Sequence, residues 1–124
     1  MTTAVTPDEA TREIGEAWAK ALNSLDSFYD LCAPGCKVWH SNDDQWISVE
    51  TAIENVHKRT PGDTPPTFEA RGVTYTEKGF FNECYVEVEL MGNPMKLHLI
   101  QLVEVEDGKA VSVKEYIGPE MPVG

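Results

Sequence analysis

The second half of the chain has a residue pattern that only β-strands fit. β-Branched, aromatic and alternating apolar side chains fill long segments, and Gly, Asn, Asp and Pro separate those segments. Consecutive strands joined by such short turns pair as antiparallel hairpins. We therefore predict a sheet with strands at about Thr67–Thr76, Phe80–Leu90, Met95–Val105 and Lys109–Ile117.

The first half has the three- and four-residue periodicity of amphipathic helices. Thr6 is the expected N-cap of a long first helix, with Pro7 at its first position and Glu9 closing a capping box. Asp26 is the expected cap of a second, shorter helix, and Ser48 is the expected cap of a third.

A short strand is expected at Cys36–Ser41, before a turn at Asn42-Asp43-Asp44. Helices that are segregated from an antiparallel sheet define the α+β class. A chain of 124 residues is long enough to bury one hydrophobic core. We therefore expect a single α+β domain over residues 1–124.

The turn at 106–109 decides which side chains share a face of the sheet. A two-residue Asp-Gly turn would set Ile100 beside Glu115, whereas a three-residue turn pairs Val105 with Lys109 and brings Leu99 opposite Glu115. The three-residue turn keeps one face almost wholly apolar, and a slip of one residue would spoil that face. We therefore predict the three-residue turn.

The charge of the chain excludes several classes of partner. There are 10 Lys and Arg residues against 21 Asp and Glu residues, which gives a formal net charge of −11. Nucleic-acid binding needs a basic groove, and an anionic membrane would repel this chain. No apolar run is long enough to span a bilayer, and residues 1–9 lack the basic and apolar parts of a signal peptide. We expect a cytoplasmic protein without nucleic-acid or membrane partners.

The three cysteines do not form a recognised motif. Cys32 and Cys36 are four residues apart, which is neither a CxxC redox pair nor half of a paired zinc site, and Cys84 is distant in sequence. In a chain without an export signal this pattern favours reduced, structural thiols over a disulfide or a metal role.

Glu115 is the most informative residue in the sequence. It lies between Val113 and Ile117 on the predicted apolar face, together with Gln101 and Asn82. A carboxylate there is costly unless it is paired, hydrogen-bonded or protonated, and desolvation would make it a usable general base or acid near neutral pH. The structural alternatives are that the end of this strand is frayed, or that Glu115 pairs with a buried donor such as an indole N–H.

Residues 38–46 form the densest polar and aromatic stretch, and could supply one wall of a pocket. His40 precedes Asp43 and Asp44, but no second His stands at ligand spacing, so we expect no metal site.

The opposite, outer face of the sheet keeps an unusual amount of apolar surface that a partner subunit could cover: Tyr85, Ile100, Leu102 and Tyr116.

The order of elements and three local signatures resemble the SnoaL-like branch of the nuclear transport factor 2-like (cystatin-like α+β cone) superfamily. The signatures are the opening helix running into residues 18–26, residues 36–43 with the helix at Ser48–Val56 after them, and residues 106–109 leading to 114–119. The resemblance implies a curved antiparallel or mixed sheet wrapped around the long first helix and two shorter helices, with a conical pocket between helices and sheet.

The resemblance also implies site residues. In epoxide-hydrolase-like members an acid just before the aromatic residue of the last strand faces the pocket, and Glu115 matches that position. The first strand of those members supplies further pocket groups, at the positions of Trp39 and Ser41. The arginine and second acid of epoxide hydrolases are replaced here by Asn82 and Cys84 or their neighbours, so epoxide hydrolysis is not expected.

Three functions remain open from the sequence. The first is a cofactor-independent isomerase, dehydratase or cyclase with Glu115 as base, acting on a small apolar uncharged molecule. The second is a non-catalytic pocket for an apolar ligand, and the third is a dimerisation module whose cone is filled by side chains. The expected ligand-binding residues, with no metal ligand among them, are Trp18, Tyr29, Trp39, Ser41, Trp46, Asn82, Cys84, Leu99, Gln101 and Val113.

Overall fold

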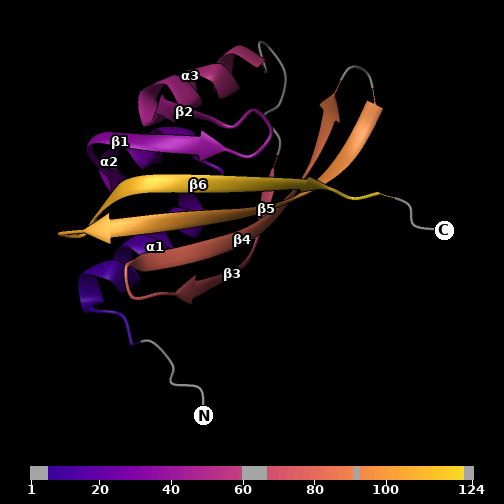
Figure 1. Ribbon diagram of the computed structural model, residues 1–124. Coiled ribbons are helices and arrows are strands. Elements are labelled where there is room, and N and C mark those ends of the chain that lie inside the picture. The colour runs from indigo at the N-terminus through magenta and orange to yellow at the C-terminus, as the bar shows by residue number, and fades with distance from the viewer. Residues whose placement is uncertain (1–5, 60–66, 91–92, 122–124) are drawn as a thin grey trace.

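The computed structural model describes residues 6–59, 67–90 and 93–121. Helices precede most of the sheet in the chain, and they lie together on one side of it (Figure 1). The elements are α1 (Glu9–Ala21), the 3-10 helix η1 (Leu25–Ser27), α2 (Phe28–Leu31), β1 (Cys32–His40), β2 (Gln45–Ser48), α3 (Val49–Arg59), β3 (Phe68–Tyr75), β4 (Gly79–Leu90), β5 (Asn93–Glu106) and β6 (Lys109–Pro119).

A single mixed sheet is the framework of the fold. Its strand order is β2-β1-β6-β5-β4-β3, and only the β1–β6 pair is parallel among the described strand pairs. The last four strands follow one another in hairpin order, as expected, and the sheet curves around the helices (Figure 1). The predicted α+β class and the curved mixed sheet are confirmed.

Two helix starts differ from the prediction. Asp8, and not Thr6, is the N-cap of α1, because its side-chain oxygen accepts a hydrogen bond from the backbone N–H of Thr11 at 2.7 Å. Asp26 lies inside η1 and caps nothing by its side chain. The expected cap of α3 is confirmed: Ser48 Oγ accepts from the N–H of Thr51 at 3.1 Å.

The predicted turn between the last two strands is wrong, although the predicted faces are right. Asp107 and Gly108 form a two-residue turn with φ values of 51° and 75°, and Glu106 pairs with Lys109. A bulge follows between Glu104 and Val105, and it shifts the register by one residue. The shift returns the apolar side chains of both strands to the inner face, which is the physical reason that the faces agree.

The core lies between the inner face of the sheet and α1. Trp18 of α1 is 3% exposed and makes edge contacts with the rings of Phe28 and Phe80, at centroid distances of 4.6 and 5.7 Å. A Cβ at Gly79 would lie 2.1 Å from the Val103 carbonyl oxygen, so the β4–β5 pairing requires glycine there. No helix in the described part of the chain has the length and apolar character needed to cross a bilayer.

Candidate functional site

A row of polar side chains crosses the inner face of the sheet at one level. His40 of β1 is the register partner of Glu115 of β6, Glu115 is the partner of Gln101 of β5, and Gln101 is the partner of Asn82 of β4. Directly opposed residues on one face lie close enough for their side chains to interact. Four adjacent strands thus bring together four polar side chains on an otherwise apolar face.

Hydrogen bonds set the orientation of this row. Trp18 Nε1 donates to Gln101 Oε1 at 2.9 Å, and Asn82 Nδ2 donates to the same oxygen at 3.3 Å. Because both donors hold the Gln101 oxygen, the amide nitrogen faces the other way and donates to Glu115 Oε2 at 2.6 Å. The buried core therefore fixes one carboxylate oxygen of Glu115 as a hydrogen-bond acceptor.

The second carboxylate oxygen faces His40. His40 Nε2 lies 3.6 Å from Glu115 Oε1, which is beyond a good hydrogen bond but within the range of an ion pair. The two side chains are 22% and 17% exposed, so both are largely shielded from water without being sealed off. Glu115 Oε1 and His40 Nε2 are thus two adjacent groups that could share or transfer a proton.

These groups line a cavity of about 130 Å³ between the helices and the sheet. Its walls come from α1, the segment after it, α3 and the inner sheet face, and most are apolar. Its charged or titratable lining consists of His40, Glu115 and the thiol of Cys32. The other lining residues are Trp18, Leu22, Leu25, Phe28, Val38, Val49, Ala52, Ile53, Val56, Phe68, Gln101 and Val113.

Two buried polar groups lie in the core beside the row. Asn82 is 0% exposed, and its Oδ1 has no hydrogen-bond partner among the described residues. Burial, with a smaller effect of the negative charge of Glu115, raises the pKa of the Cys84 thiol to about 12. Cys84 therefore stays protonated at neutral pH and is a poor nucleophile.

The structure brings four of the expected ligand-site residues to the cavity wall: Trp18, Gln101, Val113 and Glu115. Asn82, Cys84 and Leu99 lie on the same face of the sheet, buried within the core, and do not line the cavity. The indole N–H that could satisfy a buried carboxylate is present, but it reaches Glu115 indirectly, through Gln101.

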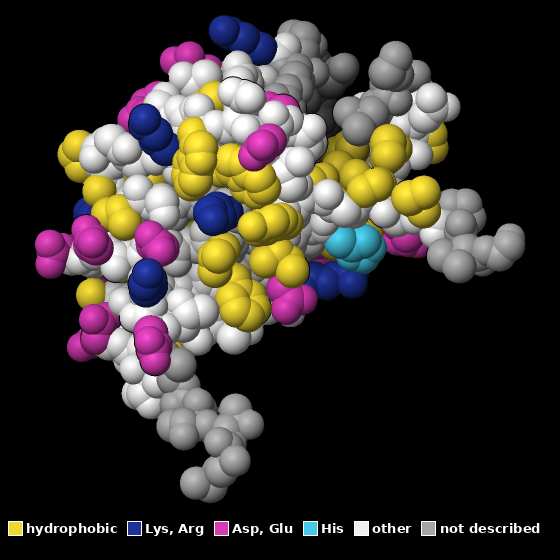
Figure 2. All heavy atoms as spheres, viewed as in Figure 1, with side chains coloured by type: hydrophobic (Ala, Val, Ile, Leu, Met, Phe, Trp, Pro, Cys, Tyr) yellow, Lys and Arg dark blue, Asp and Glu magenta, His cyan; other side chains and the backbone are white. Residues whose placement is uncertain are grey.

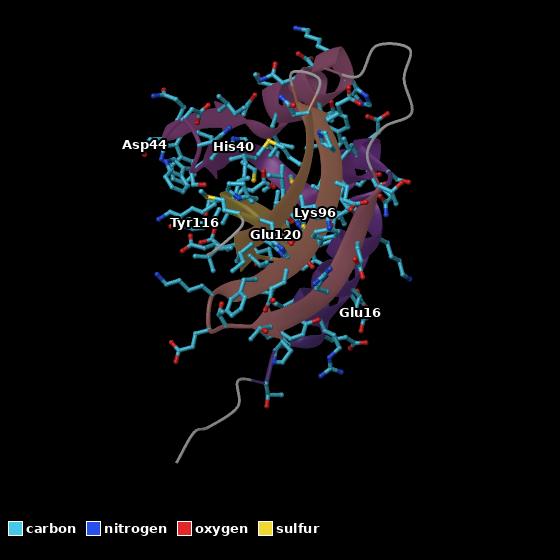
Figure 3. All side chains as sticks on the ribbon, turned by 90° about the vertical axis from the view of Figure 1, so that its right-hand side faces the viewer. Glu16, His40, Asp44, Lys96, Tyr116 and Glu120 are labelled. Carbon is cyan, nitrogen blue, oxygen red and sulfur yellow. The ribbon has the colours of Figure 1, made fainter. Side chains whose placement is uncertain are left out.

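The other expected residues lie away from this cavity. Strand alternation turns Trp39 outward: its ring contacts Tyr116 at 5.1 Å, and its Nε1 donates to Asp44 at 2.8 Å. Figure 3 shows Asp44 and Tyr116 at the outer edge of the molecule, with His40 further inward. Ser41 Oγ accepts from the backbone N–H of Ile117 at 2.9 Å. Tyr29 and Trp46 are exposed.

His40 is the site residue that the sequence analysis missed. It was considered there only as a metal ligand beside Asp43 and Asp44. In the structure Asp44 accepts a hydrogen bond from Trp39, and His40 lies on the inner face near Glu115. The signal that could have found it is the alternation of Cys36, Val38 and His40, which places all three on one face of β1. Among the described residues, no group of three or more His, Cys, Asp or Glu side chains is placed to hold a metal ion.

The sequence matches no protein-family profile and no curated protein. Solved structures match closely in shape. An NTF-2 like protein of unknown function from Burkholderia xenovorans is 19% identical, with a TM-score of 0.67 over 94% of this chain and 89% of its own. A protein provisionally assigned as a SnoaL-like polyketide cyclase, from Jannaschia, is 14% identical with a TM-score of 0.68 over 94% and 91%.

A third solved structure contains a small molecule. It is a protein with a ketosteroid isomerase-like fold from Catenulispora acidiphila, in complex with trimethylamine, and it is 12% identical with a TM-score of 0.68 over 90% of this chain and 86% of its own. At these identities the comparisons establish the fold. The chain has the fold of the SnoaL-like and nuclear transport factor 2-like superfamily.

Proposed function

We propose that this chain, with its nuclear transport factor 2-like fold, binds a small uncharged molecule in the cone cavity and moves a proton on it with Glu115 as general base. The reaction class is a cofactor-independent isomerisation, dehydration or cyclisation. The observation that supports this most strongly is the position of the Glu115 carboxylate at the cavity wall. Its Oε2 accepts a hydrogen bond from Gln101 at 2.6 Å, and its Oε1 lies 3.6 Å from His40 Nε2, which also lines the cavity.

The geometry supports different roles for the two carboxylate oxygens of Glu115. Oε2 accepts the Gln101 hydrogen bond, so Oε1 is the oxygen available to take a proton from a carbon next to a carbonyl group. His40 Nε2, 3.6 Å from Oε1, would donate a hydrogen bond to the oxyanion that develops on the substrate. Glu115 would then return the proton to another atom of the same substrate.

The cavity limits the ligand by charge. No Lys or Arg is among the described lining residues, and the cavity already holds the carboxylate of Glu115. An anionic ligand would meet a like charge with no counter-ion in a partly desolvated site. A neutral ligand avoids this cost, and a small cation such as an alkylammonium would be attracted to Glu115.

The cavity also limits the ligand by size. A volume of about 130 Å³ is similar to the ~150 Å³ apolar cavity that takes up benzene in another protein. A one-ring carbonyl compound fits this volume better than a fused multi-ring molecule. The free volume also argues against the reading in which side chains fill the cone.

A binding experiment tests the proposed ligand class. Thermal shifts are measured with cyclohex-2-enone and acetophenone as neutral one-ring ketones, benzoate as an anion of similar shape, and trimethylammonium as a small cation. We expect the ketones to raise the melting temperature and benzoate to leave it unchanged. Stabilisation by benzoate equal to that by acetophenone would contradict the proposal.

Exchange of hydrogen for deuterium next to the carbonyl group separates catalysis from binding. In D₂O the wild-type protein is expected to accelerate this exchange in a bound ketone, as followed by proton NMR. Binding of the ketones without accelerated exchange would support the second reading, a non-catalytic ligand-binding domain.

A cytoplasmic location stays a prediction, supported by the three free cysteines.

The outer face of the sheet supports a second proposal, a homodimer. Apolar side chains gather over this face (Figure 2), and the exposed ones include Trp46, Ile100, Leu102 and Tyr116. Contiguous exposed apolar surface of this kind is typical of subunit interfaces. We propose that a second copy of the chain covers it.

Ile100→Asp is expected to weaken this dimer by about tenfold or more, because two-fold symmetry would bring two new charges into the apolar interface. The mass in solution is measured by light scattering over a dilution series. Tyr29→Asp is the matched control: Tyr29 is 43% exposed and Ile100 is 44% exposed, but Tyr29 lies on α2, on the helix side. A wild-type protein that is monomeric throughout the series would refute the dimer.

A further inference from the structure

Cys32 and Cys36 come close together although they are four positions apart in one strand. Extended residues at this spacing are about 13 Å apart. In β1, however, Cys32 pairs with Ala110 and Lys37 pairs with Ser112, so five steps along β1 span only two steps along β6. The extra residues bulge out of the ladder, and Cys36 lies directly before Lys37, where the regular pairing resumes.

Pro34 and Gly35 lie within the bulge, and the backbone conformation there favours glycine at position 35. Gly35 has a φ of +82°, a conformation that favours glycine, and a Cβ there would meet nothing within 4 Å. Both residues are exposed, so the bulge projects into solvent while the cysteines on either side of it stay in the sheet. The turned-out segment thus connects the two cysteines outside the regular strand pairing.

The side chains of the two cysteines interact with each other. All three cysteines are free, and Cys32 and Cys36 are hydrogen-bonded side chain to side chain. This bond raises the pKa of Cys32 and lowers that of Cys36, because one sulfur keeps its proton and the other is stabilised as the thiolate. The compressed register between Cys32 and Lys37, together with this side-chain interaction, is compatible with the short Cα separations that disulfides need.

The two sulfurs differ in access. Cys36 is 3% exposed and belongs to the hydrophobic core, whereas Cys32 is half-buried and lines the cavity. A small reagent therefore reaches Cys32 first, and Cys36 is placed behind it. This is the arrangement of an attacked cysteine with a resolving partner.

We propose that Cys32 and Cys36 form a reversible disulfide by exchange with a small-molecule disulfide such as oxidised glutathione. As the Cys32 sulfur attacks one sulfur of the reagent, the Cys36 thiolate takes the proton of Cys32 and the S–S bond of the reagent breaks. One glutathione leaves as its thiolate, which takes up that proton from Cys36 and becomes the thiol. The Cys36 thiolate then attacks the Cys32 sulfur and releases the second glutathione. In total two protein thiols are oxidised, one disulfide is reduced, and two glutathione thiols are formed.

The disulfide would alter the wall of the cavity as well as the bulge. Cys32 is a lining residue, so its oxidation would tie the cavity wall to residues 33–35. An effect of oxidation on ligand affinity is the part of this inference that rests on the proposed function. Disulfide formation itself is measured without any ligand, so the two ideas can fail separately.

Trypsin separates the relevant cysteines cleanly. Cleavage after Lys20 and Lys37 releases residues 21–37 with Cys32 and Cys36, and cleavage after Lys78 and Lys96 releases residues 79–96 with Cys84. The folded protein is equilibrated with graded ratios of oxidised to reduced glutathione, alkylated with iodoacetamide under denaturing conditions, and digested. We expect the 21–37 peptide to lose both alkyl groups and the mass of two hydrogen atoms as the ratio rises.

Three comparisons make the outcome decisive. Cys84 is expected to stay fully alkylated, because it is only 3% exposed, whereas Cys32 is half-buried. Cys36→Ser is expected to stop at a mixed disulfide of Cys32 with glutathione, and Cys32→Ser is expected to give neither product. The inference is overturned if the wild-type 21–37 peptide keeps both alkyl groups at every ratio, if Cys84 is oxidised in parallel, or if the linkage joins two chains.

Discussion

Glu115→Gln is expected to lower the rate of α-proton exchange in a bound ketone by about 10²- to 10⁴-fold, which is the usual contribution of a positioned general base. The amide has nearly the same shape as the carboxylate, and it keeps an oxygen that can accept the Gln101 hydrogen bond. It cannot take a proton from carbon near neutral pH. The affinity for the neutral ketones is therefore expected to change little.

Glu83→Gln is the matched control for this prediction. Glu83 is an exposed residue of β4, one position from Asn82 and on the opposite face of the strand, so the same chemical change there leaves the cavity untouched. Exchange rates are measured by proton NMR for the wild-type protein and both variants at one ketone concentration. Equal rates in the wild-type protein and Glu115→Gln would remove Glu115 from the chemistry.

Trp18→Ala is expected to destabilise the fold by about 3–5 kcal/mol, the range for deleting a large buried aromatic side chain. Trp18 is 3% exposed, contacts the rings of Phe28 and Phe80, and donates to Gln101. A loss of this size is a large part of the whole stability of an ordinary domain. Urea unfolding followed by circular dichroism measures the change in the free energy of unfolding.

Two further variants separate packing from hydrogen bonding at Trp18. Trp46→Ala is the control for tryptophan removal, and because Trp46 is 47% exposed in the single chain it is expected to change stability by roughly 0.5 kcal/mol or less at a protein concentration where the chain is monomeric. Trp18→Phe keeps most of the ring packing but removes the N–H donor, leaving Asn82 as the described side-chain donor to Gln101 Oε1. A Trp18→Ala variant as stable as Trp46→Ala would contradict the assigned role of Trp18 in the core.

The strand ends near the turns were predictable because the Gly, Asn, Asp and Pro residues of each turn decide where a strand ends. The expected strand at Phe80–Leu90 is observed at Gly79–Leu90, and the expected strand at Lys109–Ile117 is observed at Lys109–Pro119. β2 was missed, because its four residues follow a polar turn and have no alternation long enough to read. It forms because β1 offers it a hydrogen-bonding edge.

The inner face of the sheet was also predictable, but for a reason other than the one assumed. Alternation placed Glu115 and Gln101 on the apolar face, and the structure pairs them directly. The turn at Asp107-Gly108 and the bulge near Val105 each moved the register by one residue relative to the prediction. A turn and a distant bulge can compensate for each other in this way, and sequence reasoning cannot choose between such combinations.

The alternation of apolar residues in the strands and their three- and four-residue spacing in the helices determined the fold class and the face of each long strand. They also placed one carboxylate on the apolar face. All of this follows from the burial of apolar side chains. Only the tertiary structure decided what surrounds that carboxylate. The contact with His40 comes from parallel pairing of β1 with β6, and the bond from Gln101 depends on Trp18 of a distant helix. Contacts between segments so far apart in the chain depend on strand order and register, which no local pattern encodes.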